Sequence, residues 1–225
     1  MRSAPSSDAP ARADQRAEYD AWAATYPAFA HNPVMRAEQT VVEPLLRRLS
    51  PRRALDVGCG SGRYLTLLAS LGASAVGVDF SFGMLSQSRG ARVCADARCL
   101  PIRRASVDLV NASLMVGDLP DLRSWTREAA RVLRPGGDLV YSDFHPNWTH
   151  LGWRRTFRDS AGALHDLPFA AHGLDRHLDA LAAAGLSLHL LREATLGADR
   201  DPAVRGFRRQ WGDPAVIVVV HATRR

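Results

Sequence analysis

The sequence contains no lysine. All 29 basic residues are arginine and, with 23 acidic residues, they give a formal net charge of +6. An excess of positive charge raises the expectation of an anionic partner such as nucleic acid. The arginines are scattered, however, and no segment interleaves basic with aromatic residues as a nucleic-acid-binding face does. The sequence therefore favours a partner other than nucleic acid.

Cysteines and long apolar runs are also scarce. Cys59, Cys94 and Cys99 have the spacing of neither a zinc site nor a redox pair. No apolar run approaches the length of a membrane span. Residues 1–14 are rich in Ala, Ser, Pro and Arg and lack the apolar centre of a secretory signal. We expect residues 1–14 to be a disordered tail and the protein to be cytoplasmic, with no membrane partner.

The chain does contain an alternation of short apolar runs and helical patterns. With 225 residues, 46% of them hydrophobic, it is long enough for one domain with a sizeable core. The alternation predicts a parallel sheet whose strands are joined by crossover helices. Strands are expected at residues 53–57, 75–80, 91–95, 107–113, 138–143, 186–195 and 215–223. The last connection has too little helical pattern for a crossover helix, so the final pair is expected to be antiparallel.

A glycine-rich loop lies between the first strand and the helix that follows it. Its sequence, from Asp56 to Gly62, is Asp-Val-Gly-Cys-Gly-Ser-Gly. The glycines let the backbone turn tightly and approach a ligand closely, and the helix start presents free N–H groups. A tight structural turn would need the same glycines, so the loop alone does not establish a site.

Acidic residues also end the next two strands. Asp79 ends the second strand, where a carboxylate can accept two hydrogen bonds from ribose hydroxyls, although it could instead cap the following helix. Asp96 follows the third strand and could accept a hydrogen bond from an adenine amine, although an aspartate there also forms turns. Ligands of open α/β sheets bind at the carboxyl ends of the strands. Three acids at that edge therefore indicate a nucleoside site.

These segments resemble the motifs of the class I S-adenosyl-L-methionine (SAM)-dependent methyltransferases. Within that family, the chain looks most similar to the group that includes ubiquinone/menaquinone methyltransferases and natural-product tailoring enzymes. The segments that carry the resemblance are residues 55–63, 76–81, 95–101, 107–113 and 133–137, together with the tyrosine-rich opening at 19–26.

The resemblance implies an α/β fold: a Rossmann-like, doubly wound, seven-stranded sheet, mostly parallel with an antiparallel last strand, with helices on both faces. The domain would span residues 15–225, with a helical lid at 15–50 and a substrate-side insertion at 146–172. The implied activity is methyl transfer from SAM to a small-molecule acceptor in secondary-metabolite or quinone biosynthesis, leaving S-adenosyl-L-homocysteine (SAH).

The resemblance also implies roles for individual residues. The methionyl end of the cofactor would lie against the glycine loop, with Asp56 facing its ammonium group, and the two tyrosines would close over the sulfonium. Asp79 would bind the ribose, and Asp96 with the Ala97 N–H would read the adenine. The implied cofactor-binding set is Tyr19, Tyr26, Asp56, Gly58, Gly60, Gly62, Asp79, Phe80, Met84, Asp96, Ala97, Asn111 and Ala112.

Two histidines are candidate general bases. His145 lies just beyond the fifth strand, close to the expected point of methyl transfer, and His172 ends the insertion. Either could equally be structural. The histidine spacings match no metal motif, so no metal is expected. Aromatic residues in the insertion suit a planar or apolar substrate, but they could simply pack the insertion onto the sheet.

Three alternatives to this function differ in the features they require. An NAD(P)-dependent oxidoreductase would need G-x-G-x-x-G, whereas this loop reads G-x-G-x-G. A methyltransferase of RNA or protein often carries an Asn-Pro-Pro-aromatic run, whereas Asn111 is followed by Ala-Ser-Leu. A SAM-binding protein that catalyses another reaction stays open. The sequence does not determine the acceptor or the oligomeric state, so a homodimer also stays open.

Overall fold

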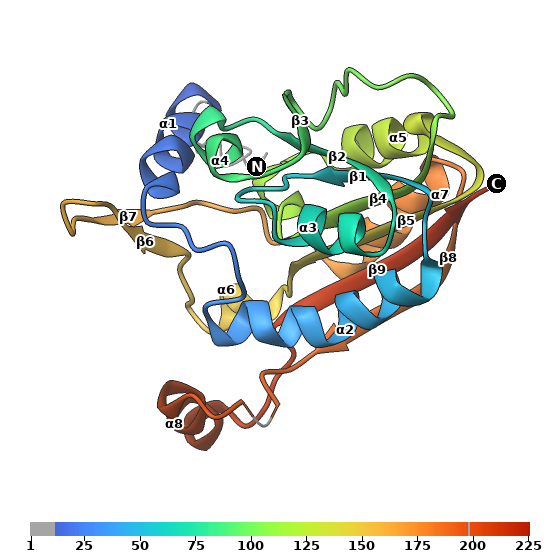
Figure 1. Cartoon of the computed structure of the whole chain (residues 1–225). Coiled ribbons are helices and arrows are strands. Elements are labelled where there is room, and N and C mark those ends of the chain that lie inside the picture. The colour runs from blue at the N-terminus through green and yellow to red at the C-terminus, as the bar shows by residue number, and fades with distance from the viewer. Residues whose placement is uncertain (1–11, 198) are drawn as a thin grey trace, which may run out of the picture.

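A seven-stranded sheet forms the centre of the molecule (Figure 1). The computed structural model describes residues 12–197 and 199–225. The strand order across the sheet is β3 (Ala91–Cys94), β2 (Ser74–Asp79), β1 (Arg53–Val57), β4 (Val107–Ser113), β5 (Leu133–Phe144), β9 (Ile217–Arg224) and β8 (Leu186–Ala194). The pairs from β3 through β5 are parallel, and β9 runs antiparallel to both of its neighbours. The expected doubly wound sheet with an antiparallel last strand is confirmed.

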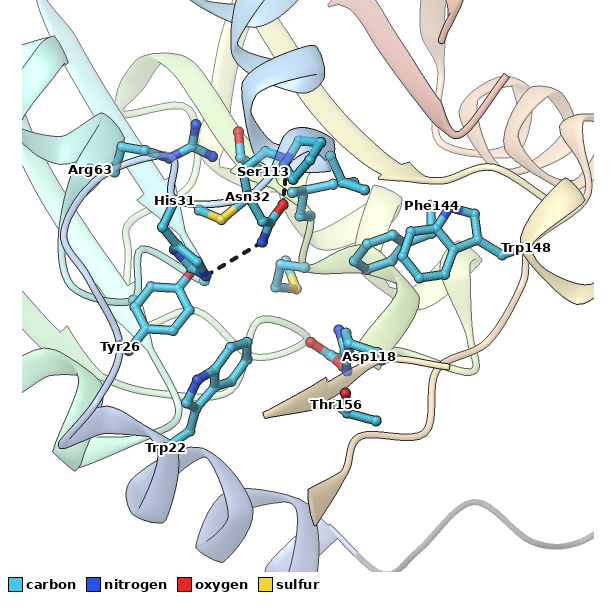
Figure 2. Close-up of a pocket in the computed structure, with 18 of the residues that line it drawn as sticks. Trp22, Tyr26, His31, Asn32, Arg63, Ser113, Asp118, Phe144, Trp148 and Thr156 are labelled. Atoms are coloured by element: carbon cyan, nitrogen blue, oxygen red, sulfur yellow. Dashed lines mark hydrogen bonds and ion pairs between the residues drawn. The ribbon is translucent and has the colours of Figure 1, made fainter. Parts of the chain in front are cut away.

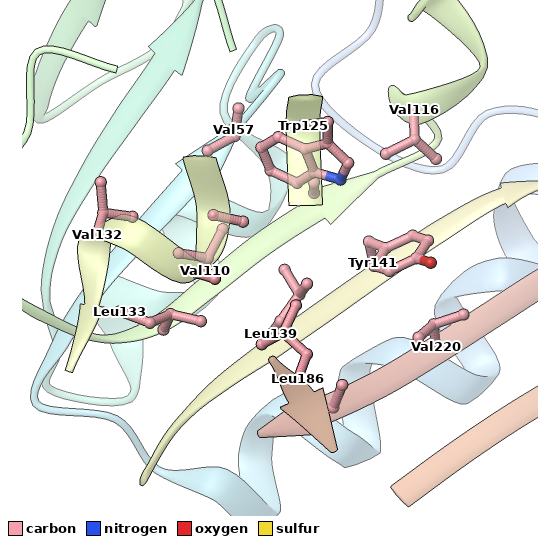
Figure 3. Packing of buried hydrophobic residues seen from close by; sticks show 14 of the residues in the cluster. Val57, Val110, Val116, Trp125, Val132, Leu133, Leu139, Tyr141, Leu186 and Val220 are labelled. Carbon is pink, nitrogen blue, oxygen red and sulfur yellow. The ribbon is translucent and has the colours of Figure 1, made fainter. Parts of the chain in front are cut away.

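Helices cover both faces of the sheet because alternate strand residues point to opposite faces. In β1, Leu55 and Val57 contribute to one core cluster and Ala54 to the other. The first cluster packs under α5 (Leu122–Val132) and α7 (Leu174–Ala183), and the second packs under α2 (Pro33–Leu49) and α3 (Arg63–Ser70). Within the first cluster, Trp125 of α5 is fully buried against the sheet (Figure 3).

Helix α5 begins where the sequence predicts. The Asp121 carboxylate accepts hydrogen bonds from the backbone N–H groups of Arg123 and Ser124, at 3.1 and 3.2 Å. These bonds satisfy two of the donors that a helix start leaves unpaired. The cap and the apolar stripe of α5 together fix the crossover between β4 and β5.

The N-terminal region divides into two parts. Helix α1 (Arg12–Ala23) packs against α4 (Phe82–Gln87), beyond the edge of the glycine loop (Figure 1). Helix α2 instead packs on the sheet. The part of the predicted lid that follows the first turn of α2 therefore belongs to the core. Of the predicted disordered tail, residues 1–11 lie outside the described residues, and α1 begins at Arg12.

Two connections contain more structure than the sequence patterns predict. The expected insertion holds α6 (Asn147–His150) and a hairpin of β6 (Thr156–Arg158) and β7 (Leu164–Asp166). The β8–β9 connection, predicted to lack a helix, contains α8 (Pro202–Trp211). Asp201 caps α8 by accepting the Ala203 N–H at 3.0 Å. Among the described residues, no helix is long and apolar enough to cross a membrane.

Candidate functional site

A cavity of about 400 Å³ lies at the carboxyl ends of β1, β2, β4 and β5, beside the point where the strand order reverses. Ligands of open α/β sheets bind at this switch point. Around it, Trp22, Tyr26 and His31 lie on one side and Phe144 and Trp148 on the opposite side (Figure 2). A smaller cavity adjoins it, and both are lined by Gly58, Asp79, Phe80, Met115 and Asp118. The walls thus come from the glycine loop, α1, the insertion and α8.

The glycine loop gives the cavity a floor of bare backbone. Gly58 and Gly60 line the cavity with φ angles of +66° and +53°, which side-chain-bearing residues rarely adopt. A Cβ built on Gly58 would lie 2.3 Å from the Met115 Cγ. Both the conformation and the close packing therefore require glycine, and they leave the loop backbone accessible to a ligand.

Asp79 connects the loop to the cavity. Its Oδ2 accepts the Gly60 N–H at 2.8 Å, and its Oδ1 accepts the Ser81 N–H at 2.9 Å. Burial raises the pKa of Asp79 to about 6, while these hydrogen bonds act in the opposite direction. Each carboxylate oxygen keeps a lone pair for a further donor, so Asp79 can bind two hydroxyl groups as well as hold the turn.

Helix α1 closes the cavity with aromatic rings and a charged network. Tyr19 packs edge-on against Phe80, with ring centroids 5.4 Å apart, and its hydroxyl donates to Asp118 at 2.6 Å. Asp118 also pairs with the buried guanidinium of Arg155 from the insertion. Burial raises the pKa of Tyr19 well above its usual value. This network ties the N-terminal helix to the insertion across the cavity.

A second network brings Arg63 to the cavity wall. The fully buried Glu38 of α2 accepts hydrogen bonds from the Tyr64 hydroxyl at 2.7 Å, Arg63 Nη2 at 3.0 Å and the Ser142 hydroxyl at 3.0 Å. The Arg63 guanidinium therefore has a fixed position next to the glycine loop. A planar guanidinium with remaining donors can bind the carboxylate of an amino-acid group.

Eight of the thirteen expected cofactor-binding residues line a cavity. Those that do are Tyr19, Tyr26, Gly58, Gly60, Asp79, Phe80, Met84 and Ala97. Those that do not are Asp56, Gly62, Asp96, Asn111 and Ala112. The cavity wall beyond β4 is made instead by Ser113, Leu114 and Met115, which follow the expected pair along the chain.

Asp56 lies beneath the loop, and Asp96 lies beside the smaller cavity. The buried Asp56 accepts a hydrogen bond from Asn111 Nδ2 at 2.7 Å, and burial raises its pKa to about 7. Asp56 lines neither cavity, and its Oδ2 is buried without a hydrogen-bond partner, so its contact with an ammonium group stays a prediction. Asp96 pairs with Arg98, with 3.2 Å between Oδ2 and Nη2, while its neighbours Ala95 and Ala97 line the smaller cavity.

Neither predicted base reaches the cavity. The Nε2 of His145 lies 2.7 Å from Glu193 of β8, and its Nδ1 accepts the Asn147 N–H at 3.0 Å, so both ring nitrogens are occupied. His172 points its Nε2 at the Leu119 carbonyl, 2.8 Å away. Each ring links elements of the fold behind the cavity. Neither ring lines a cavity, so this geometry does not support the prediction that either acts as the general base.

His31 is the histidine that lines the cavity among the described residues. It lies between α1 and α2 and packs edge-on against Tyr26, with ring centroids 5.5 Å apart. Its Nε2 lies 3.4 Å from the Asn32 amide nitrogen (Figure 2). Burial lowers the pKa of His31, which favours the neutral ring. Its Nδ1 lies 3.3 Å from the Phe29 carbonyl oxygen, so both ring nitrogens have polar neighbours.

Sequence patterns gave little indication of the residues that complete the site. Arg63 directly follows the glycine loop, which was a usable local signal. No local signal places His31, Asp118, Val204 or Phe207 at the cavity, because only the packing of distant segments brings them there. No group of His, Cys, Asp and Glu among the described residues could hold a metal ion.

Comparison with known proteins points to one family. Residues 55–141 match the profile of a methyltransferase domain. A malonyl-[acyl-carrier protein] O-methyltransferase of Dechloromonas aromatica is 35% identical over 151 residues, covering 65% of this chain and 56% of that protein. A demethylmenaquinone methyltransferase of Corynebacterium urealyticum is 39% identical over 95 residues, 41% of each chain.

A solved structure supports the same fold. The S-adenosylmethionine-dependent methyltransferase from Mesorhizobium loti superposes with a TM-score of 0.64 at 24% identity, over 80% of this chain and 96% of that one. The chain spans about half the length of the curated relatives it matches. The methyltransferase profile, at residues 55–141, includes the glycine loop and the strands around it but not α1, the insertion or α8.

Proposed function

We propose that the chain is a class I SAM-dependent methyltransferase and that it transfers the methyl group of SAM to a small-molecule acceptor. One observation carries the proposal. Asp79 and the glycine turn, at the ends of adjoining parallel strands, face a cavity that extends beyond them between the insertion and α8. The cavity therefore has room for a nucleoside at the turn and a second molecule beside it.

The residues present fit the cofactor. Asp79 would accept the two ribose hydroxyls, and Arg63 would bind the carboxylate at the methionyl end. Ala95, Ala97 and Leu119 of the smaller cavity would pack against the adenine. Tyr19, Tyr26, Phe80 and Met84 would enclose the rest. Asn111 and Asp56 would support the turn from below through their 2.7 Å hydrogen bond.

The cofactor, when bound, supplies an activated methyl group. The contribution of the protein is then to align an acceptor and exclude water. The rings of α1 and the insertion close the cavity on the acceptor side. This supports the role proposed for the insertion (146–172) and for the first part of the lid predicted at residues 15–50. The relatives named above act on small or carrier-bound acyl and quinone compounds, consistent with a small-molecule acceptor.

Calorimetric titration tests the proposal. We expect SAM and SAH to bind at one site per chain and NADH not to bind. Incubation with SAM and an acceptor should then form SAH and the methylated acceptor in equal amounts. Binding of NADH in place of SAM would contradict the assignment. Conversion of an acceptor without methyl transfer and without formation of SAH would instead support a different reaction on the same fold.

The affinity for SAH should depend on pH through Asp79. Its pKa of about 6 means that the carboxylate is mostly ionised above pH 6 and protonated below it. Ribose hydroxyls donate to the ionised form, so affinity is full above pH 6 and is lost as the pH falls through that value. At pH 5, we expect affinity to be about tenfold lower than at pH 8. Asp79→Asn should bind more weakly and show a flat profile, and an equally steep profile in that variant would refute the role of Asp79.

A further inference from the structure

The part of the cavity farthest from the glycine loop is walled by aromatic and aliphatic side chains. Phe144, Trp148, Trp153 and Phe207 form a continuous series, with successive ring centroids 4.6, 4.7 and 4.8 Å apart. This series runs from the end of β5 through the insertion to α8. Figure 2 shows Phe144 and Trp148 facing the cavity across from Tyr26 and His31. Leu196 and Val204 complete this wall.

The arginines of the cavity are all paired with carboxylates. Arg63 pairs with Glu38 at 3.0 Å, Arg155 pairs with Asp118, and Arg154 pairs with Asp166. Among the described lining residues, no arginine lacks an acidic partner, and Asp79 adds a further negative charge. Arg63 is assigned to the cofactor carboxylate, Arg155 is paired with the equally buried Asp118, and Arg154 lies largely exposed beside Asp166. A carboxylate brought against the aromatic wall would therefore have to give up its hydration without gaining an unshared counter-charge from the protein. Burying an unpaired charge is strongly unfavourable.

We infer that the acceptor is an uncharged, ring-bearing apolar molecule, not a carboxylate-bearing one, and that α8 supplies part of its binding wall. The inference rests on the proposed function, since it assigns a ligand to the part of the cavity that the cofactor would not occupy. Aromatic walls and a few polar groups are typical of sites for such molecules. The neutral His31 and Asn32 are the polar groups opposite the aromatic wall.

Helix α8 offers a matched pair of test positions. Phe207 lines the cavity, whereas Trp211, one turn further along the same helix, is 46% exposed and does not. The helix is anchored independently of both rings, because Arg36 Nε lies 2.6 Å from Asp199 just before it and Asp201 caps its first turn. Truncation of either ring is therefore expected to leave the fold intact.

The test uses two probes with the same ring system and different charge. 2-Naphthol is uncharged and 2-naphthoate is anionic at pH 7, and each is titrated calorimetrically into protein saturated with SAH. We expect 2-naphthol to bind at least about tenfold more tightly. Phe207→Ala should weaken 2-naphthol roughly tenfold, Phe207→Leu less, and Trp211→Ala by less than about twofold. The affinity for SAH should stay unchanged in all three variants.

Several outcomes would overturn the inference. They are equal or tighter binding of 2-naphthoate, no binding of 2-naphthol at millimolar concentration, and equal losses in Phe207→Ala and Trp211→Ala. The titrations are repeated without SAH. A failure of SAH to bind would then contradict the proposed function. The ratio of the affinities for the two probes would still test the charge preference of the cavity.

Discussion

Replacing Asp79 with alanine is expected to weaken SAH binding by at least roughly 100-fold. The variant loses two hydrogen bonds from ribose hydroxyls to a charged acceptor, each worth about 1.5–3 kcal/mol. It also leaves the Gly60 and Ser81 N–H groups, now held at 2.8 and 2.9 Å, without their acceptor. The turn should therefore lose its shape as well as its ligand contact. Calorimetry with SAH measures the first effect, and thermal unfolding measures the second.

The matched control is Asp179→Ala, an exposed aspartate on α7 that lines neither cavity. It should change neither SAH affinity nor stability measurably. Asp79→Asn keeps one acceptor oxygen and should lie between the wild type and Asp79→Ala in affinity. Unaltered SAH affinity in Asp79→Ala would remove the ribose role and, with it, the main support for the site.

Replacing Glu38 with alanine is expected to lower the free energy of unfolding by about 3 kcal/mol. Removal of one partner from a buried ion pair leaves the other charge uncompensated, at a cost of about 3–5 kcal/mol. Arg63 keeps other contacts, with Nη1 3.3 Å from both Gln39 Oε1 and the Tyr64 hydroxyl, so the lower end of that range applies. Urea unfolding followed by circular dichroism measures the difference.

Glu43→Ala is the control on the same helix. Glu43 pairs with Arg47 at the surface, one turn apart, with 2.6 Å between Arg47 Nη2 and Glu43 Oε1. Exposed pairs of this spacing contribute about 0.3–0.5 kcal/mol. Glu38→Gln retains an amide oxygen for Tyr64 and should recover part of the loss. If Glu38→Ala were no less stable than Glu43→Ala, the network would not anchor α2 and Arg63 as inferred.

The elements around the glycine loop follow from local chemistry. Each strand from β1 to β4 is a short apolar run, and the turn after β1 requires glycine whatever the surroundings. Asp121 caps α5 through neighbours two and three residues away. Interactions over such short distances can be predicted from the sequence. For the same reason Gly58, Gly60 and Asp79, which lie at strand ends, were predicted as cavity residues and do line it.

The predictions failed where distant packing decides. Helix α8 has Val204, Phe207 and Trp211 at helical spacing, but the sequence does not show that Val204 packs into the core cluster on that face of the sheet. His145 follows β5 closely in sequence, yet its ring turns away to meet Glu193 of β8, 2.7 Å from its Nε2. Asn111 lies within β4, and its side chain donates to Asp56 beneath the loop. The cavity wall is therefore formed by residues that follow it, Ser113, Leu114 and Met115.

By itself, the sequence determined the class of fold and the cofactor edge of the sheet, because strand periodicity, glycine turns and helix caps act between near neighbours. The tertiary structure alone decided which side chains form the cavity walls beyond the glycine loop. His31, Arg155 and Phe207 come from three segments far apart in the chain, and their approach depends on how α1, the insertion and α8 pack against the sheet. The long-range contacts that bring these segments together, such as that of Arg155 with Asp118, leave no pattern in the sequence of either partner.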